Sequence, residues 1–371
     1  MLGLFLLLPV LALYARELPD YSPALLGFTM GAYGLAQVLL QIPFGRWSDR
    51  RGRKPLITLG LLVYAAGSVI GVLAHTLLGL LAARVVQGAG AVSAPVMALL
   101  ADLTRPQSRT RAMAFIGISI GLSFVAALVL APALDTAIGV SGIFGVMFAM
   151  AIVGIALLHV AVPREPPRGD APELRRYEGL LGMLRLRALQ PLYFGVFSLH
   201  FLLTATFLAV PQVLSGDLGI PPAQHWLVYL GVFLASLAGT VPMVLGTERG
   251  SFDRGSFALS VLLLATVQGL LGIDHDDRWA VLPALAGFFA AFNYLEARLP
   301  AMLTVAAPAS ERGAALGMFA TAQFLGAFAG GSLGGLLLGR FGLSGVFWGS
   351  AVLSLVWAVG MLPRAPSTNL A

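Results

Sequence analysis

Long apolar runs follow one another along almost the whole of this 371-residue chain, separated by short polar connections. About 20 apolar residues in helical form cross a hydrocarbon core of about 30 Å. Within a bilayer, a helix satisfies its backbone donors and acceptors inside its own segment. The composition, 58% hydrophobic and 11% charged, is unlike that of soluble domains. The sequence therefore predicts an all-α membrane protein.

We predict twelve transmembrane helices, at residues 1–15, 24–44, 55–74, 78–101, 112–134, 141–162, 191–213, 226–246, 256–273, 279–303, 314–338 and 343–362. Fifteen helical residues rise only about 22 Å, so the first range is too short to cross the core unaided. We therefore expect a truncated or misassigned start at the N-terminus.

Lysine and arginine are concentrated in alternate connections of this predicted topology. Eighteen lie on the side of the connection after the second span, and three lie on the opposite side. The positive-inside rule places the richer side, and both termini, in the cytoplasm of a cell inner membrane. This asymmetry also explains the pI near 10 without a nucleic-acid partner.

The longest connection, residues 163–190, divides the spans into two sets of six. We predict an N-terminal bundle over 1–162, a cytoplasmic linker with an amphipathic segment on the inner leaflet, and a C-terminal bundle with a short tail over 191–371. Two pairs of residues share an offset of 201 positions, Gly45 with Gly246 and Arg111 with Arg312. Duplication of a six-helix half explains this repeat.

The connection after the second span is dense in charge and bounded by glycines. Its spacing is Gly-x-x-x-Asp-x-x-Gly-Arg-Lys, formed by Gly45, Asp49, Gly52, Arg53 and Lys54. A topology signal requires the cations, whereas the carboxylate and the fixed spacing require another explanation. The pattern resembles the signature loop between helices 2 and 3 of major facilitator superfamily transporters.

The resemblance extends over nearly the whole chain. The segment from Arg84 to Gly90 is similar to the superfamily's Arg-x-x-Gln-Gly element, and further stretches resemble the YajR-type branch of drug/proton antiporters: Leu2 to Leu11, Gln41 to Leu59, Val96 to Ser119, Phe197 to Phe207 and Gln323 to Gly335. The resemblance implies two pseudo-symmetric six-helix bundles that work by alternating access. Because the chain ends at Ala371, we expect the branch's soluble C-terminal domain to be absent.

The resemblance also implies a conformational gate. In such proteins the carboxylate at the position of Asp49 meets the N-terminal end of helix eleven, here near residues 313–317. A helix N-terminus carries about half a positive charge, which makes this contact favourable. Arg53 and Asp102 would complete the network. The predicted gate residues are Gly45, Asp49, Gly52, Arg53, Lys54 and Asp102.

One element departs from the resemblance. The antiporter signature in helix five is a Gly-Pro followed by a glycine pair, and Ala131-Pro132 stands in its place. The resemblance therefore supports the fold more strongly than it supports export as the direction of transport.

Ionisable side chains at bilayer depth are costly and commonly face a cavity. The candidates for proton coupling are Glu296, His200 and Arg84. Imidazole exchanges protons near neutral pH, which suits His200. Two alternatives stay open: Arg84 bonds carbonyls of neighbouring helices, and His200 is a structural core residue.

Polar and aromatic residues in the spans give a second set of candidates, for the substrate cavity: Gln37, Gln41, Asn293, Gln323 and Phe292. Gln37 and Gln41 share one helix face at i, i+4. Bonding between helices, or plain packing for Phe292, is the alternative for each.

These observations predict a proton-coupled secondary transporter, a monomer without cofactor or metal, that exports an amphipathic or drug-like compound. A proton symporter that imports a metabolite is one alternative. A membrane-embedded enzyme is another, although the only dense acidic cluster, Asp274 to Asp277, lies in a short loop that we expect to be solvated. A channel is the third, although no repeated filter sequence is present. We therefore expect no enzymatic activity.

Overall fold

The computed structural model describes residues 2–105, 108–163, 182–248, 253–308 and 311–361. Its regular secondary structure in these ranges is helical. The chain divides into two compact units, the first formed by Met1–Ala171 with Pro221–Leu227 and the second by Pro172–Ile220 with Val228–Ala371. The predicted linker, 163–190, and the turn 249–252 lie largely or wholly outside the described residues.

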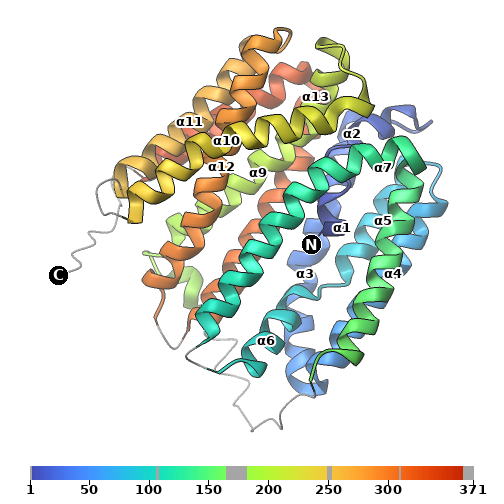
Figure 1. Ribbon diagram of the computed structural model, residues 1–371, viewed down its shortest axis with the longest axis vertical. Helices are drawn as coiled ribbons and strands as arrows, with labels where there is room; N and C mark the ends of the chain where they lie inside the picture. The colour runs from blue at the N-terminus through green and yellow to red at the C-terminus, as the bar shows by residue number, and fades with distance from the viewer. Residues whose placement is uncertain (1, 106–107, 164–181, 249–252, 309–310, 362–371) are drawn as a thin grey trace. The chain divides into compact units, whose positions relative to one another are not determined.

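The first unit contains a bundle in which α3, α4 and α5 pack side by side (Figure 1) and α7 packs along α4. Its elements are α1 (Leu2–Phe5), α2 (Leu11–Tyr14), η1 (Ala15–Glu17), α3 (Pro23–Arg51), α4 (Arg53–Leu73), α5 (Leu77–Ala89), α6 (Ser93–Leu103), α7 (Arg109–Val160) and η4 (Pro222–Gln224).

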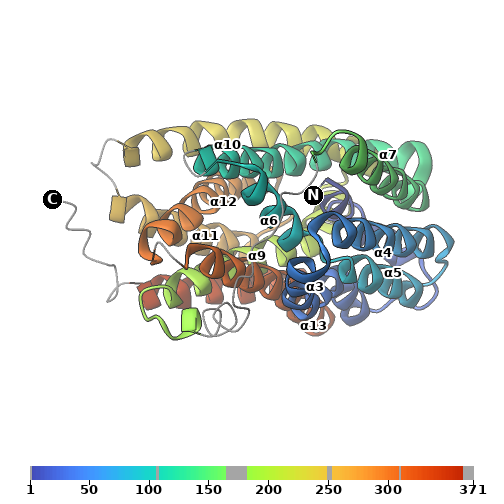
Figure 2. The ribbon, with the colours of Figure 1, turned by 90° about the horizontal axis from the view of Figure 1, so that it is seen from below.

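The second unit is built around α9, which packs along α13 (Figure 2), while α11 packs against both α12 and α13. Its elements are α9 (Gln190–Gln212), the π-helical turn η3 (Val213–Asp217), most of α10 (His225–Glu248), α11 (Asp253–Ile273), α12 (Arg278–Ala306) and α13 (Arg312–Met361).

The prediction of twelve spans is confirmed. Nine helical segments among the described residues are long and apolar enough to cross a membrane. Two of them, α7 and α13, hold two spans each, because Gly139 and Gly342 adopt φ of 67° and break the helical path. The twelfth is the N-terminal segment, in which α1 and α2 are separated by a turn.

One predicted boundary is wrong, and one predicted span with the expected bounds is interrupted inside. The second span continues as helix through Arg51, because no residue before Gly52 breaks it and Arg50 and Arg51 in its last turn favour the negative end of the helix dipole. The fourth span is interrupted between α5 and α6. Pro95 lies in the first turn of α6, where its missing N–H leaves no intrahelical hydrogen bond unmade.

A carboxylate outside the spans connects two segments of the first unit. Asp20 accepts hydrogen bonds from the backbone nitrogens of Leu77, at 2.6 Å, and Leu78, at 2.9 Å. These N–H groups begin α5, where the helix dipole also favours an anion. The two backbone donors hold the pKa of Asp20 below its usual range.

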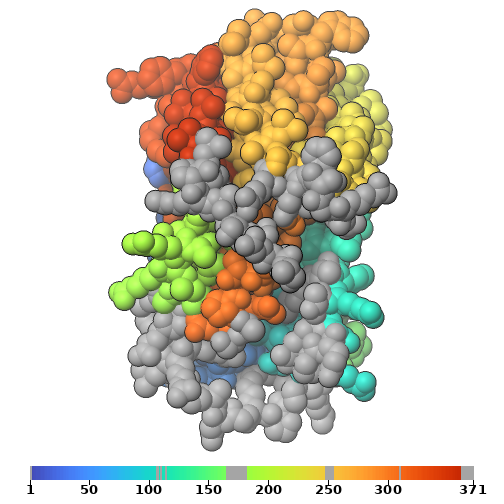
Figure 3. All heavy atoms as spheres, turned by 90° about the vertical axis from the view of Figure 1, so that its left-hand side faces the viewer, coloured from blue at the N-terminus to red at the C-terminus, as the bar shows by residue number. Residues whose placement is uncertain are grey.

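On the surface of the second unit, α11 and the C-terminal part of α13 lie next to each other (Figure 3). Large apolar side chains are exposed there: Leu259, Leu262, Leu270, Val352, Leu355, Val356 and Val359. A soluble protein rarely exposes such a continuous set, and lipid tails are the environment in which it is stable. The chain is a multi-pass membrane protein.

Candidate functional site

Three helices of the second unit bring together His200, Glu296 and Gln323, which lie far apart in the sequence. His200 lies near the middle of α9, Glu296 in α12 and Gln323 in α13. The Nε2 atom of His200 lies 2.7 Å from Gln323 Nε2 and 3.8 Å from Glu296 Oε2. We call these three residues the His200 cluster.

The partners of the His200 ring define its tautomer. Its Nδ1 lies 3.2 Å from the carbonyl oxygen of Val196, one turn earlier in α9. A carbonyl oxygen only accepts, so Nδ1 carries the hydrogen. The Gln323 amide nitrogen only donates, so Nε2 of His200 accepts. Both contacts agree on a neutral ring with one acceptor nitrogen, and this nitrogen is the atom nearest Glu296.

Glu296 is partly accessible, with 38% of its side chain exposed, whereas the side chain of His200 is 9% exposed. The Oε2 atom of Glu296 is buried and has no hydrogen-bond partner among the described residues. An unpaired carboxylate oxygen beside an imidazole nitrogen can share or exchange a proton with it. The pair is therefore chemically suited to the proton coupling that the sequence predicts.

The other two cavity candidates of this unit lie on α12. The ring of Phe292 is buried, stands edge-on to His200 at 6.1 Å between centroids, and stacks on Phe288. Asn293 donates to Ser236 of α10 over 3.4 Å. Phe292 thus forms an apolar wall of the His200 cluster, whereas Asn293 contacts a neighbouring helix.

Glycines in α13 set the distance between Gln323 and His200. A Cβ atom at Gly326 would overlap the backbone of Phe197, and one at Gly330 would overlap the backbone of Phe201. These glycines let α13 approach α9 closely, as small residues commonly do in membrane helix packing. Gln323 lies one turn before Gly326 and His200 one turn after Phe197, so the close approach brings their side chains into contact.

We expect Gly326→Ala to destabilise the chain by about 1–3 kcal/mol, the usual cost of inserting a group into packed space. It should also separate Gln323 from His200, because the added methyl must displace α9. Thermal unfolding in detergent measures the first effect. Gly231→Ala in α10, where nothing lies within 4 Å of the new Cβ, is the matched control and should be neutral or stabilising. Equal stability of the two variants would contradict this account.

In the first unit, Arg84 of α5 is 3% exposed and is held by polar and aromatic groups. Its Nη1 donates to Gln87 Oε1 over 3.0 Å, and Gln87 in turn donates to Ser68 of α4 over 2.9 Å. The guanidinium also lies 4.9 Å from the centroid of the Tyr33 ring. Its Nε has no partner among the described residues. These contacts are with side chains, so the alternative of bonding to neighbouring carbonyls finds no support in them.

Gln37 and Gln41 are both buried in α3. Gln37 donates to the hydroxyl of Tyr33 over 3.0 Å. The side-chain oxygen of each glutamine has no hydrogen-bond partner among the described residues. Buried acceptors without partners are costly, and water or a ligand would satisfy them. The prediction that they line a substrate cavity stays a prediction with this support.

The charged connection forms a compact ion network in the first unit. Arg53, 5% exposed at the start of α4, pairs with Asp49 near the end of α3 and donates through Nε to Asp102 of α6 over 3.1 Å. Its Nη1 also donates to Ser48 over 2.7 Å. Lys54 donates to the carbonyl of Val162 over 2.6 Å. Three of the residues predicted to form a gate, Asp49, Arg53 and Asp102, are therefore connected through Arg53, while their role in gating stays a prediction.

The two glycines of this connection differ. Gly52 has φ of 108°, a conformation that strains other residues, and α3 ends there. Gly45 lies within α3, and a Cβ there would meet Ala94 at an ordinary 3.8 Å. Gly45 therefore needs neither an unusual backbone nor a close approach, because the chain reverses seven residues later, at Gly52.

A comparison with protein-family models decides the family. The model described as Major Facilitator Superfamily matches residues 1–191 and again 192–370. The chain belongs to the Major Facilitator Superfamily. It is therefore a secondary transporter and not an enzyme, and it has the two-bundle fold of that family. The resemblance to the superfamily read from the charged connection is confirmed.

Individual relatives agree with the superfamily assignment. The chain is 42% identical to "Inner membrane transport protein YajR" of Escherichia coli (strain K12), over 96% of this chain and 79% of that protein. It is 25% identical to "Multidrug resistance protein 2" of Bacillus subtilis (strain 168), over 91% of this chain and 85% of that protein. Among solved structures, a D-xylose-proton symporter matches with a TM-score of 0.78 at 16% identity, over 99% and 97% of the two chains. This last likeness concerns the fold alone.

Sequence reasoning missed several partners of the candidate residues. Ser48, Tyr33 and Gln87 take part in the networks of Arg53, Gln37 and Arg84. The sequence did contain a signal for two of them: Gln87 is three residues from Arg84, and Tyr33 is four residues from Gln37. Residues at these spacings on one helix face each other and can form hydrogen bonds. Ser48 carried a weaker one, since serine is common in any helix end.

Proposed function

We propose that the chain is a proton-coupled secondary transporter that moves a small molecule by alternating access, with the His200 cluster as its proton site. The observation that supports this is the position of His200 Nε2, which lies 2.7 Å from Gln323 Nε2 and 3.8 Å from Glu296 Oε2. Proton carriers require an ionisable group at membrane depth whose two protonation states favour different contacts. His200 meets this requirement.

Protonation of His200 reverses the role of Nε2. In the neutral ring this nitrogen accepts from Gln323. In the cationic ring it carries a hydrogen and faces a second donor, so the Gln323 amide must turn or move away. At the same time the cation is attracted to Glu296, 3.8 Å away. Proton uptake thus exchanges a contact between α9 and α13 for one between α9 and α12.

The attraction is large enough to shift a conformational equilibrium. Two unit charges 4 Å apart attract by about 4 kcal/mol at an effective dielectric constant of about 20, and by about 1 kcal/mol in water. Because 38% of the Glu296 side chain is exposed, the lower part of this range applies. Even about 1.4 kcal/mol changes a two-state ratio roughly tenfold.

Export of an amphipathic or drug-like compound is the transport that we propose. The similarity to "Multidrug resistance protein 2" supports it. The candidate cavity residues of the first unit, Gln37 and Gln41, are buried amides, and the second unit offers the aromatic ring of Phe292. Amides suit the polar part of such a ligand and an aromatic ring its apolar part.

Import by proton symport is the second candidate function. Ala131-Pro132 departs from the antiporter signature of helix five, and this departure favours it. Both functions use the same proton site and differ in whether proton and substrate move in opposite directions or together.

We propose an inner-membrane location with both termini and the charged connection in the cytoplasm, and a monomeric carrier. The distribution of lysine and arginine, eighteen on one side against three on the other, supports the orientation. The similarity to an inner membrane transport protein of Escherichia coli supports the location.

Reconstitution into proteoliposomes tests the proposal. A pH gradient is imposed, a panel of amphipathic cations, neutral compounds and metabolites is screened, and proton movement is followed with a trapped pH indicator. We expect saturable flux of at least one compound that requires the gradient and that moves protons. Opposite directions of proton and substrate support antiport, and equal directions support symport.

Vesicles without protein and vesicles with a collapsed gradient are the controls. Saturable flux that no gradient alters, with no proton movement, would overturn proton coupling. Flux that never saturates would favour a channel.

A further inference from the structure

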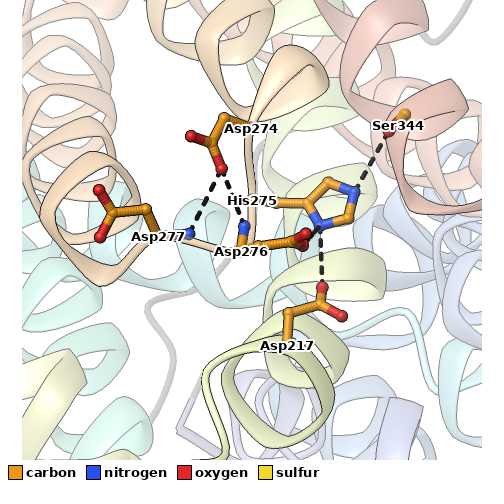
Figure 4. A network of polar contacts seen from close by, with 6 residues as sticks. All are labelled: Asp217, Asp274, His275, Asp276, Asp277 and Ser344. Atoms are coloured by element: carbon orange, nitrogen blue, oxygen red, sulfur yellow. Dashed lines mark hydrogen bonds and ion pairs between the residues drawn. The ribbon is translucent and has the colours of Figure 1, made fainter.

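A second polar cluster lies in the second unit, away from the His200 cluster, where three connecting segments meet. It consists of Asp217 at the end of η3, His275 and Asp276 in the connection between α11 and α12, and Ser344 just after the bend of α13 (Figure 4). Asp217 and Ser344 are 58 and 69 residues from His275 in the sequence. We call this set the His275 cluster.

The expectation that residues 274–277 are all solvated is wrong for His275, whose side chain is 20% exposed. Its ring stands between Asp217 and Ser344, with Asp276 turned toward it and Asp277 turned away (Figure 4). Two carboxylate oxygens therefore approach one ring nitrogen. Asp217 Oδ2 lies 2.9 Å and Asp276 Oδ1 3.1 Å from His275 Nδ1.

From this geometry we infer that the His275 cluster binds a divalent transition-metal ion of the Zn²⁺ type. The ligands are His275 Nδ1, Asp217 Oδ2 and Asp276 Oδ1, which all lie within 4.8 Å of one another. Zinc bonds to nitrogen and carboxylate oxygen are about 2.0–2.2 Å long, which places neighbouring ligands of a tetrahedral ion about 3.3 Å apart. The separations of His275 Nδ1 from the two carboxylate oxygens, 2.9 Å and 3.1 Å, are close to this value, and water completes the coordination.

Ser344 supplies the support that a ligating histidine needs. Its Oγ lies 3.2 Å from His275 Nε2. A histidine bound through Nδ1 carries its hydrogen on Nε2 and commonly donates it to a neighbouring oxygen, which orients the ring. The serine hydroxyl can accept this hydrogen. On the side of the ring away from the carboxylates, His275 Nε2 therefore already has a hydrogen-bond acceptor.

The ligand types select among metals. An imidazole nitrogen with carboxylates suits zinc and its neighbours in the first transition row. Calcium takes six to eight oxygen ligands and magnesium keeps an oxygen octahedron, so neither fits a nitrogen ligand in this position. A bound ion would connect η3 to the α11–α12 connection and restrain the two segments together.

Other acidic residues of the same loop serve different purposes and offer a matched control. Asp277 caps α12 by accepting from the backbone nitrogen of Trp279 over 2.9 Å. Asp274 accepts from the backbone nitrogens of Asp276 and Asp277. Asp277→Asn and Asp276→Asn are therefore the same chemical change at adjacent positions, one outside the ligand set and one within it.

Calorimetric titration of the full purified chain in detergent with Zn²⁺ tests the inference. We expect one ion per chain for the wild type and for Asp277→Asn. Binding should be lost in His275→Ala and in Asp217→Asn. Binding should be weakened, but not lost, in Asp276→Asn, because the Asp276 side chain is 81% exposed. In Ser344→Ala the affinity should fall about 10–100-fold. Zn²⁺ should raise the unfolding temperature only of the chains that bind it.

Two further measurements keep the test decisive if a variant folds poorly. Co²⁺ added to the wild-type chain should give the visible absorption of a tetrahedral site with a nitrogen ligand, and excess Ca²⁺ or Mg²⁺ should not displace it. A wild-type chain that binds neither Zn²⁺ nor Co²⁺ would show that the cluster is only a set of hydrogen bonds. Undiminished binding by His275→Ala would place the ion elsewhere, and either result overturns the inference.

Discussion

Replacing Glu296 with Gln is expected to reduce proton-driven transport to the rate of protein-free vesicles, while exchange of substrate for substrate persists. Glutamine keeps the size of glutamate and resembles its protonated, neutral form. A carrier fixed in that form can still bind substrate and change conformation, but it cannot release a proton. His200→Gln should have the same effect, because it removes the ring that takes up the proton beside Glu296.

The geometry predicts that the two variants are not additive. His200 and Glu296 are 3.8 Å apart, and groups that act as one unit lose their function when either is removed. The double variant should therefore be no worse than either single one. Proton movement and counterflow, measured in the same proteoliposomes, separate loss of coupling from loss of transport.

The matched control is Glu17→Gln, a glutamate that is exposed in η1. It should transport at the wild-type rate. Unchanged proton-driven flux in both single variants and in the double variant would place the coupling site elsewhere, with Arg84 as the next candidate.

Features that depend on one segment of chain could be predicted from the sequence. The apolar runs indicated twelve spans because a helix needs a fixed length to cross the bilayer. Asp49, near the end of α3, and Arg53, at the start of α4, are only four residues apart in the chain, so their closeness in sequence already indicated contact. The helical path through Gly45 was missed because glycine marks turns only on average, and here neighbouring residues carry the helix to Gly52.

Features that depend on packing could not be predicted in the same way. Sequence reasoning named His200, Glu296 and Gln323 separately, as scarce polar groups in three different spans. Their meeting depends on the rotation of α9, α12 and α13, which is set by contacts such as Gly326 on the backbone of Phe197. Hydrophobic periodicity could not supply that rotation, because lipid-facing and core-facing sides of these spans are both apolar.

The same limit applies to the His275 cluster. The run from Asp274 to Asp277 was read as solvated because charged loop residues usually are. The ligand that changes this reading, Asp217, is 58 residues away and ends a π-helical turn. Its position depends on how η3 continues α9, which no local pattern specifies.

Replacing Asp49 with Asn is expected to shift the carrier toward the inward-open state about tenfold. We propose that Asp49, besides pairing with Arg53, forms a latch with the N-terminal turn of α13 when the cytoplasmic side closes. A charge at a helix N-terminus is worth about 0.3–1 kcal/mol when exposed and about 2 kcal/mol when partly buried. The side chain of Asp49 is 29% exposed, and a loss of about 1.4 kcal/mol corresponds to the tenfold shift. Fewer outward-facing molecules should also mean slower transport.

Distances between spin labels at the cytoplasmic ends of α3 and α13 measure this shift. The chain contains no cysteine, so two introduced cysteines take the labels without background. The control is Asp102→Asn, because Asp102 shares Arg53 with Asp49 but lies at the end of α6. If Asp49 acts as a latch, only Asp49→Asn lengthens the distances, and substrate affinity of a conformationally trapped carrier stays near wild type. Equal shifts in both variants would assign the effect to the Arg53 network. Unchanged distances with weaker substrate binding would make Asp49 part of the binding site.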